Sequence, residues 1–209
     1  FSLTGLIYVV FLDTPLKHII YSPLNVFFSS FREAGALRPL NLEDESAEHF
    51  GVKYVYDFTP LQLMDGDACT ECGRCQQVCP AYMAGTPLNP KQVVLDIQRG
   101  LNQYGGEMLN LAAMAKGEMP VRTGEDALWA CTTCRACVYE CPVMIEHVDA
   151  IVDMRRSLVL NDSSMPAQLQ TAMVQAERAG NPWGNAKGTR MAWADGLKVP
   201  LISEKKKAD

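Results

Sequence analysis

Residues 69–80 read Cys-Thr-Glu-Cys-Gly-Arg-Cys-Gln-Gln-Val-Cys-Pro, and residues 131–142 read Cys-Thr-Thr-Cys-Arg-Ala-Cys-Val-Tyr-Glu-Cys-Pro. These two runs contain all eight cysteines of the chain, and each has the spacing C-x2-C-x2-C-x3-C-P. Every cysteine of the second run follows its counterpart by 62 residues, as 131 follows 69. The cysteine pattern is therefore an internal repeat.

This spacing is typical of [4Fe–4S] ligation, in which three closely spaced thiolates bind three corners of one cluster. In two-cluster ferredoxins the fourth cysteine, just before proline, binds the other cluster. The runs therefore predict two clusters with crossed ligands, and metal binding should then contribute directly to folding. The predicted ligands of cluster one are Cys69, Cys72, Cys75 and Cys141. The predicted ligands of cluster two are Cys131, Cys134, Cys137 and Cys79.

Two other uses of eight cysteines fit less well. Disulfides are disfavoured because the cysteines are clustered and the chain shows no cleavable signal peptide with a charged n-region. Structural zinc sites typically combine well-separated Cys-x2-Cys or Cys and His pairs, unlike these two unbroken runs. A structural metal-binding module that mediates protein contacts remains an alternative from a different functional class.

The amino-acid composition excludes several other classes of function. The 209 residues are 48% hydrophobic and 21% charged, which is typical of a globular, partly helical protein. The formal charge of −5 and the lack of a basic face argue against nucleic acid as a partner. No glycine-rich dinucleotide loop, P-loop or Ser-His-Asp set is recognisable, so we expect the electron-transfer part of an oxidoreductase without its own substrate site.

Apolar residues at helical spacing predict a mainly α fold. One helix should start at Asn89-Pro90 and end at Gly105-Gly106, with a second following from Met108. A third is outlined by apolar residues from Val148 to Val159. A fourth should run from near Ser164 to Gly180, with a core-facing stripe. That stripe consists of Leu169, Ala172, Met173 and Ala176.

The N-terminal region is unusually apolar. Phe1 to Leu12 covers about half of the roughly 20 residues needed to cross a bilayer. A second apolar stretch, residues 24–31, is flanked by Lys17 and Arg32, as at the cytoplasmic end of a membrane segment. We therefore expect a membrane-associated segment here, the alternative being a soluble arm docked on a partner. Because the chain begins with Phe rather than Met, we expect it to be a piece of a longer protein.

The expected organisation has four parts. Residues 1–32 are the end of a membrane or interfacial segment, and residues 33–64 form a linker with an acidic stretch. Residues 65–162 form an α-helical ferredoxin-type domain with two [4Fe–4S] clusters. Residues 163–209 form a C-terminal helix and an extended tail that docks on a partner.

Two arginines and two histidines are further residues whose roles can be predicted from their positions in the sequence. Arg74 and Arg135 lie inside the cysteine loops and are candidates to raise the cluster potentials, the alternative being surface solvation. His147 is expected to be structural at a helix start, and His49 to be exposed in the acidic stretch.

Several short segments carry a family resemblance. The insert between the runs opens with Asn-Pro-Lys at 89–91, and Ile-Glu-His and Met-Arg-Arg follow at 145–147 and 154–156. Gly-Asn-Pro-Trp-Gly occupies 180–184. Together these make residues 65–200 resemble heterodisulfide-reductase-type iron–sulfur oxidoreductases. The cysteine runs alone are shared with cluster subunits of glycerol-3-phosphate and succinate dehydrogenases.

Residues 16–28 resemble the end of the last membrane helix of nitrate-reductase gamma-type cytochrome b subunits. On that resemblance His18 matches an axial haem b ligand, the alternative being an interfacial histidine without metal. Some family members fuse such a membrane domain to the cluster domain and link an electron-transferring flavoprotein, or a related donor, to the quinone pool. This implies a location at the cytoplasmic face of the membrane, with a flavoprotein donor and a quinone-reactive membrane subunit as partners.

The resemblance also leaves a second possibility open. The chain would then be a soluble cluster subunit of a heterodisulfide reductase, or of a dehydrogenase such as the glycerol-3-phosphate dehydrogenase type. Longer family members continue into cysteine-rich CCG domains, whereas no cysteine follows Cys141 in this sequence. Disulfide reduction is therefore not expected of this chain alone.

Overall fold

A computed structural model describes residues 4–5, 15–30, 32–33, 35–45, 47, 49–108, 119–121, 123–197 and 199. The described residues are mainly helical, and their only β pairing is an isolated bridge between Tyr54 and Pro120. The chain divides into two compact units, residues 1–164 and residues 165–209. The mainly α fold class is confirmed.

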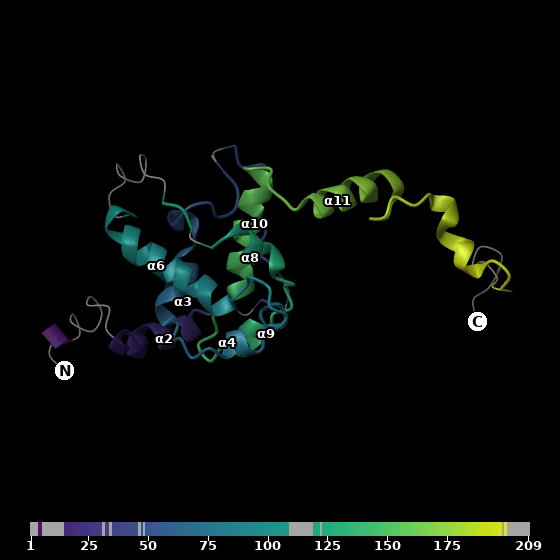
Figure 1. Ribbon diagram of the computed structural model, residues 1–209. Helices are drawn as coiled ribbons and strands as arrows, with labels where there is room; N and C mark the ends of the chain where they lie inside the picture. The colour runs from purple at the N-terminus through teal and green to yellow at the C-terminus, as the bar shows by residue number, and fades with distance from the viewer. Residues whose placement is uncertain are drawn as a thin grey trace. The chain divides into compact units, whose positions relative to one another are not determined.

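The first unit contains both short and long helices (Figure 1). Those before the second cysteine run are η1 (Pro15–Lys17), α2 (His18–Phe27), η2 (Val55–Asp57), α3 (Pro60–Ala68), α4 (Arg74–Gln77), α5 (Pro80–Met83), α6 (Pro90–Met108) and α8 (Glu125–Ala130). The helix α9 (Ala136–Tyr139) lies within that run, and α10 (His147–Leu160) follows it. The second unit contains α11 (Ala167–Ala179) and η3 (Lys187–Ala194).

The helix α3 leads into the first cysteine run, and its start is fixed by local sequence. Thr59 and Gln62 form a capping box, in which the Thr59 hydroxyl accepts from the Gln62 N–H and the Gln62 side chain accepts from the Thr59 N–H. Pro60 occupies the first helical position, where its missing N–H is not needed. The buried Gln62 amide also donates to Asp153 on α10 (2.9 Å), which ties α3 to that helix.

The long helix α6 begins where the sequence predicted. The Asn89 side chain accepts from the N–H groups of Lys91 (3.0 Å) and Gln92 (3.3 Å), so it caps the helix ahead of Pro90. The predicted end at Gly105-Gly106 is wrong, because α6 continues through both glycines to Met108. Glycine weakens a helix by only about 1 kcal/mol, which neighbouring residues can offset. The predicted second helix lies largely outside the described residues, at 109–118.

The core of the first unit gathers residues from α6, α10 and the segment before α3. Val52 and Phe58 are buried in it together with Val93, Ile97 and Ile151. Part of the segment expected to be a linker therefore contributes to the core, and residues 55–57 form η2. The predicted helix after the second cysteine run is confirmed as α10.

In the second unit, α11 ends as predicted at Gly180, which has a left-handed backbone (φ +72°). The prediction that its apolar stripe faces a core is wrong, because α11 contains no buried residue. Leu169 is 38% exposed and Met173 is 62% exposed. Asn181 closes the following turn by donating to the Asn185 carbonyl (2.7 Å) and accepting from its N–H (3.0 Å).

Candidate iron–sulfur centre

The two cysteine runs fold into loops with the same backbone. Each loop follows a helix, α3 or α8, and then forms a one-turn helix, α4 or α9, whose bounds also differ by 62 residues (136 against 74). Positive φ angles recur at equivalent positions, with +54° at Glu71 and +55° at Thr133, and +79° at Gly73 and +63° at Arg135. Non-glycine residues rarely adopt this conformation, so its repetition indicates a shared functional geometry.

The left-handed residues direct backbone N–H groups toward sulfur. The Thr133 N–H donates to Cys131 Sγ (3.4 Å), and the Glu71 N–H lies in the same position toward Cys69. A similar contact joins the Ile145 N–H to Cys141 Sγ (3.4 Å). Such donors stabilise thiolates and tune the potential of a cluster that the thiolates bind.

Four cysteines surround one hollow at the first loop. Cys69, Cys72 and Cys75 line it together with Cys141, which comes from the other run. The hollow has a volume of about 20 Å³ and also borders Lys91 and His147. The structure thus brings together all four residues of the first predicted ligand set.

The second predicted set gathers in the same way. Neighbouring Cys79 contributes, after burial, to the raised pKa of both Cys131 and Cys137, and Cys134 also contributes at Cys131. Cys79 therefore lies beside the cysteines of the second run, as Cys141 lies beside those of the first. Its neighbour Pro80 begins α5, so the chain turns away directly after the thiol.

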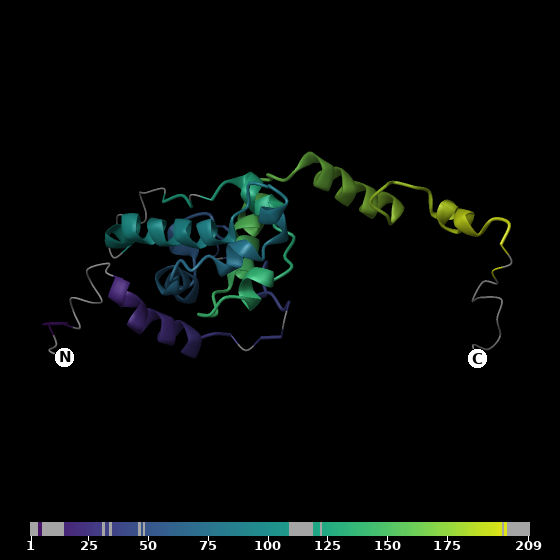
Figure 2. The ribbon, with the colours of Figure 1, turned by 60° about the horizontal axis from the view of Figure 1, so that its bottom comes forward.

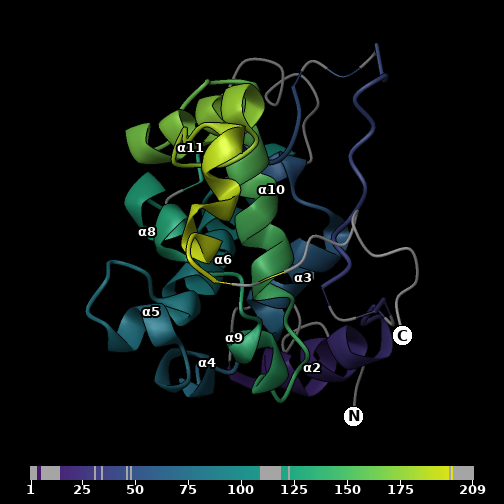
Figure 3. The same ribbon diagram turned by 90° about the vertical axis from the view of Figure 1, so that its right-hand side faces the viewer.

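The two sets adjoin each other. Cys75 and Cys137, one from each set, share a buried apolar cluster with Val148 of α10. Their helices α4 and α9 pack together, as Figures 1 and 3 both show. Whatever the two sets bind therefore lies in neighbouring positions.

The thiols need a cation to become thiolates at neutral pH. Burial, and then the adjacent Cys69 and Cys141, raises the pKa of Cys75 to about 11. Burial, and then Cys131, raises the pKa of Cys137 to about 12. An iron–sulfur cluster supplies positive iron to four sulfur ligands, so this donor set fits the group. When bound, a [4Fe–4S] cluster takes up and releases single electrons.

A polar network that the sequence did not reveal supports the first set. Asp65 is buried on α3, and burial raises its pKa to about 7 even though its carboxylate accepts from Asn25 and from the Glu146 N–H. The Asn25 amide on α2 donates to Asp65 (2.8 Å) and to the carbonyl of Val143 (3.0 Å). Val143 is two residues after Cys141 in the sequence. No motif marks these two residues, because they meet only through tertiary packing.

The two loop arginines differ from one another. Arg74 is exposed, where water screens its charge. Arg135 forms an ion pair with Glu146 (3.2 Å), so its charge is largely balanced. A third arginine, Arg155 on α10, donates to the carbonyl of Cys131. The sequence placed Arg155 only in a family motif and gave it no role.

The three histidines have separate positions. His147 is buried at the start of α10, with Nδ1 at 3.0 Å from the Ile145 carbonyl oxygen, and burial lowers its pKa to about 4. The prediction that His49 is exposed is wrong, because it is half-buried and pairs with Asp57 (2.8 Å). His18 begins α2, and its Nδ1 is buried without a hydrogen-bond partner among the described residues. Its haem role stays a prediction.

The helix α2 packs against α3 in the first unit (Figure 2). Lys17 and Arg32, expected to flank a membrane segment, instead form ion pairs within the unit with Asp67 (3.0 Å) and Asp149. Within the described part of the chain, no helix has the length and hydropathy needed to span a bilayer.

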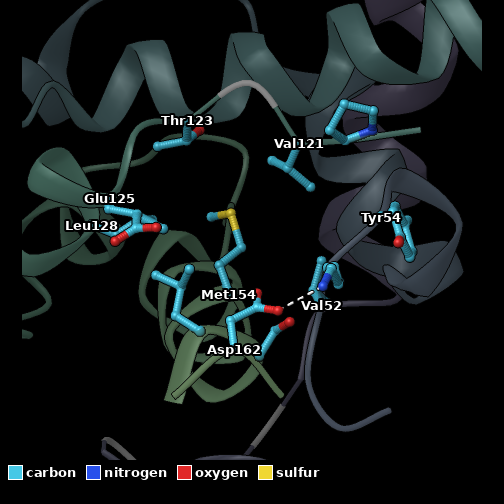
Figure 4. Close-up of a pocket in the computed structure, with 12 residues that line it drawn as sticks. Val52, Tyr54, Val121, Thr123, Glu125, Leu128, Met154 and Asp162 are labelled. Carbon is cyan, nitrogen blue, oxygen red and sulfur yellow. Dashed lines mark hydrogen bonds and ion pairs between the residues drawn. The ribbon is translucent and has the colours of Figure 1, made fainter. Parts of the chain in front are cut away.

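A second hollow lies away from the cysteines (Figure 4). Its volume is about 360 Å³, and no cysteine lines it. Apolar side chains such as Val52, Val121 and Met154 form much of its wall, and Glu125 and Asp162 add carboxylates. This hollow is not part of the ligand sets.

Comparison with known proteins agrees with the geometry. Residues 62–142 match the family model of the 4Fe-4S dicluster domain. The chain is 36% identical to "Probable iron-sulfur-binding oxidoreductase FadF" of Bacillus subtilis, over 99% of this chain and 34% of that protein. It is 39% identical to "Probable membrane-anchored ferredoxin" of Chromohalobacter salexigens, over 93% of this chain and 33% of that protein.

It is also 36% identical to "EtfAB:quinone oxidoreductase" of Syntrophomonas wolfei, over 87% of this chain and 28% of that protein. The chain thus spans about a third of the length of these relatives. Subunits C and D of heterodisulfide reductases match shorter stretches at about 31% identity, so the predicted family resemblance is confirmed. Residues 62–142 are therefore a 4Fe-4S dicluster domain, which provides for two [4Fe–4S] clusters, in a chain that is similar to iron–sulfur oxidoreductases and heterodisulfide reductase subunits.

Proposed function

We propose that this chain passes single electrons between two adjoining clusters within a membrane-associated, quinone-linked oxidoreductase that is fed by a flavoprotein. The observation that carries the relay is the shared burial of Cys75 and Cys137, which brings the two cysteine sets together. In the proposal, Cys69, Cys72, Cys75 and Cys141 hold one cluster. Cys131, Cys134, Cys137 and Cys79 hold the other.

The chain's own residues have two tasks in this proposal. The buried thiols, Cys75 and Cys137, keep the space between the two sets free of water. Cys72 and Cys134 are exposed and give each set one solvent-facing ligand. A donor and an acceptor therefore have separate positions at which to approach.

The first experiment counts metal in the full chain after anaerobic reconstitution. We expect about eight irons and eight sulfides per chain and a visible absorption that bleaches on reduction. Iron content of about four or less, or bound zinc without redox activity, would instead favour a structural metal module.

Membrane association rests on α2 and on one relative's name. Asn25 on the inner side of α2, and Lys17 directly before the helix, are buried against the domain. The outer residues of α2 are apolar and exposed, with Ile19 at 68% and Phe27 at 74% exposure. Exposed apolar surface of this kind marks contact with a membrane or a partner. The relative from Chromohalobacter salexigens is named a membrane-anchored ferredoxin.

Vesicle flotation tests this part separately. The holoprotein should float with phosphatidylcholine vesicles, and the double change Ile19→Ser with Phe27→Ser should reduce the floating fraction. Met173→Ser on α11 removes an equally exposed apolar side chain and serves as the control. If the holoprotein stays with the soluble fraction, the alternative is favoured, a soluble cluster subunit of a heterodisulfide reductase or dehydrogenase.

The donor and acceptor are proposed from the relative named EtfAB:quinone oxidoreductase. A reduced electron-transferring flavoprotein mixed with the holoprotein should bleach the cluster absorption, whereas free reduced flavin at the same concentration should act more slowly. Equal rates would remove the flavoprotein from the proposal. The quinone-reactive subunit and the docking of residues 163–209 on a partner belong to the same proposal.

The proposal also assigns His18 the role of a haem b ligand. A buried imidazole nitrogen without a partner calls for a ligand or a donor from another element. Haem titration of the holoprotein, followed by absorption near the Soret band, tests it. Binding that His18→Gln does not weaken would exclude this residue as the ligand.

A further inference from the structure

The guanidinium of Arg155 lies against the start of the second cysteine loop. Its Nε and Nη2 both donate to the carbonyl of Leu128, the former at 2.9 Å, and Nη2 also donates to the carbonyl of Cys131. The same group stacks over the Trp129 ring, 5.2 Å from its centroid. Arg155 therefore holds the backbone that leads from α8 into the loop.

The charge of Arg155 is not balanced by an acid. Among the described residues no carboxylate forms an ion pair with it. The next residue, Arg156, differs in this respect, because it pairs with Asp153 (2.8 Å) and donates to the Arg38 carbonyl. Arg155 is also half-buried, so its field is screened less by water than that of a surface charge.

Different side chains hold the backbone at the start of the first loop. There the Ser22 hydroxyl donates to the Ala68 carbonyl (3.2 Å), and Lys17 is paired with Asp67 (3.0 Å). Together these three side chains carry no net charge. The repeat of the cysteine ligands therefore does not extend to the charges around them.

Among the other charged groups, one half-buried lysine borders the first set without an ion pair among the described residues. Lys91 lines the hollow of that set, and the Asp65 carboxyl lies close enough to Cys141 to interact electrostatically with it. Arg74 is exposed, and Arg135 is paired with Glu146. Among the described residues, only the second set has such a cation hydrogen-bonded to its ligand loop, because Arg155 donates to the Cys131 carbonyl whereas the Lys91 side chain makes no hydrogen bond to the first loop.

We propose that Arg155 gives the cluster held by the second set the higher reduction potential, so that it is the first of the two to be reduced. A nearby positive charge stabilises the electron that reduction adds, and the hydrogen bond to the ligand loop adds to the effect. This inference rests on the two-cluster function proposed above. Arg155 acts through the Cys131 loop and is a positioning residue.

The test is an anaerobic redox titration of the holoprotein followed by electron paramagnetic resonance. The native chain should show two reduction steps. Arg155→Gln should lower the equilibrium constant of the higher-potential step about tenfold, which is about 59 mV for a one-electron couple, and leave the other step in place. Arg155→Lys keeps the charge and should retain most of the native potential. Arg156→Gln removes a paired cation from the same helix and should move neither step.

A second measurement uses variants of two cysteines and leaves Arg155 unchanged. Cys72 and Cys134 are equivalent in the repeat, both are exposed, and each belongs to its own run whichever way the fourth ligands are paired. Cys134→Ser should alter the spectrum of the higher-potential step, and Cys72→Ser that of the lower. The reverse assignment would overturn the inference, as would an Arg155→Gln protein with full iron whose higher step is unchanged. Low iron in the native chain would instead count against the two-cluster function itself.

Discussion

Gly51 packs against the backbone of α10, and replacing it with alanine should destabilise the first unit strongly. A Cβ atom at this position would lie 2.5 Å from the Asp153 carbonyl oxygen and 2.6 Å from the Ser157 nitrogen. Both are helix backbone atoms and cannot move aside as a flexible side chain can. The residue also has a φ of +75°, which L side chains rarely adopt.

The expected cost has two parts. The left-handed backbone costs about 1 kcal/mol or somewhat more for alanine. The steric overlap adds about 2 kcal/mol, since overpacking a tight contact typically costs about 1–3 kcal/mol. Relief would shift residues 50–52 away from α10 and weaken the hydrogen bond from the Val52 N–H to the Asp153 carbonyl (2.9 Å). The sum of about 3 kcal/mol should lower the melting temperature by about 10 °C.

Gly85 provides a matched control. Its φ of +76° is nearly the same, but a Cβ there would meet nothing within 4 Å. Gly85→Ala should therefore show the backbone cost alone, a fall of about 3 °C. Both variants are compared with the native holoprotein by anaerobic thermal scans at one scan rate, since unfolding with cluster loss is irreversible. Equal falls for the two variants would refute the tight packing of Gly51 on α10.

Two further predictions concern the polar network at the first ligand set. Because burial raises the folded-state pKa of Asp65 from 3.8 to about 7, the native protein should lose stability as the pH rises through that window, by about 4 kcal/mol in all. Asp65→Asn should remove this pH dependence, measured as the rate of cluster loss in guanidinium, and an unchanged slope would assign it elsewhere. Asn25→Leu removes two buried donors and should cost about 2–4 kcal/mol, seen as faster amide exchange in α2. Ser29→Ala, which loses only an exposed bond to Val26, should have little effect.

Spacing alone predicted the two cysteine sets, and local signals predicted the helices α6, α10 and α11. The short helices in and next to the cysteine runs were not predicted; these are α3, α4, α5, α8 and α9. The C-x2-C-x2-C-x3-C-P runs carry a local geometry that is written in consecutive residues. The cap at Asn89 and the stop at Gly180 are likewise local signals, and both are found in the structure. Features set by a few neighbouring residues can be predicted from one sequence.

Features set by long-range packing could not be predicted. Residues 52–58 look like a linker because their apolar residues show no helical period, yet Val52 and Phe58 are in the core. The stripe on α11 looks like a core face, yet its side chains are exposed. Helical spacing shows that a face is apolar but does not say what covers it.

The roles of the charged residues near the ligand loops could not be predicted from the sequence either. Arg74 and Arg135 were plausible tuning residues because they lie between ligands, but one is exposed and the other is paired. Arg155 is distant in sequence from Cys131 and reaches it only because α10 packs beside α8. Two residues that interact across 24 positions leave no short-range pattern to read.

The pairing of the fourth cysteines can be tested with two double variants of the reconstituted chain, each analysed for iron. Cys79→Ser with Cys137→Ser removes two ligands that the crossed arrangement gives to one cluster, so about four irons should remain. Cys79→Ser with Cys75→Ser should damage both clusters and leave almost no iron. The opposite result, in which the second variant keeps about four irons and the first keeps almost none, would mean that each run binds its own cluster.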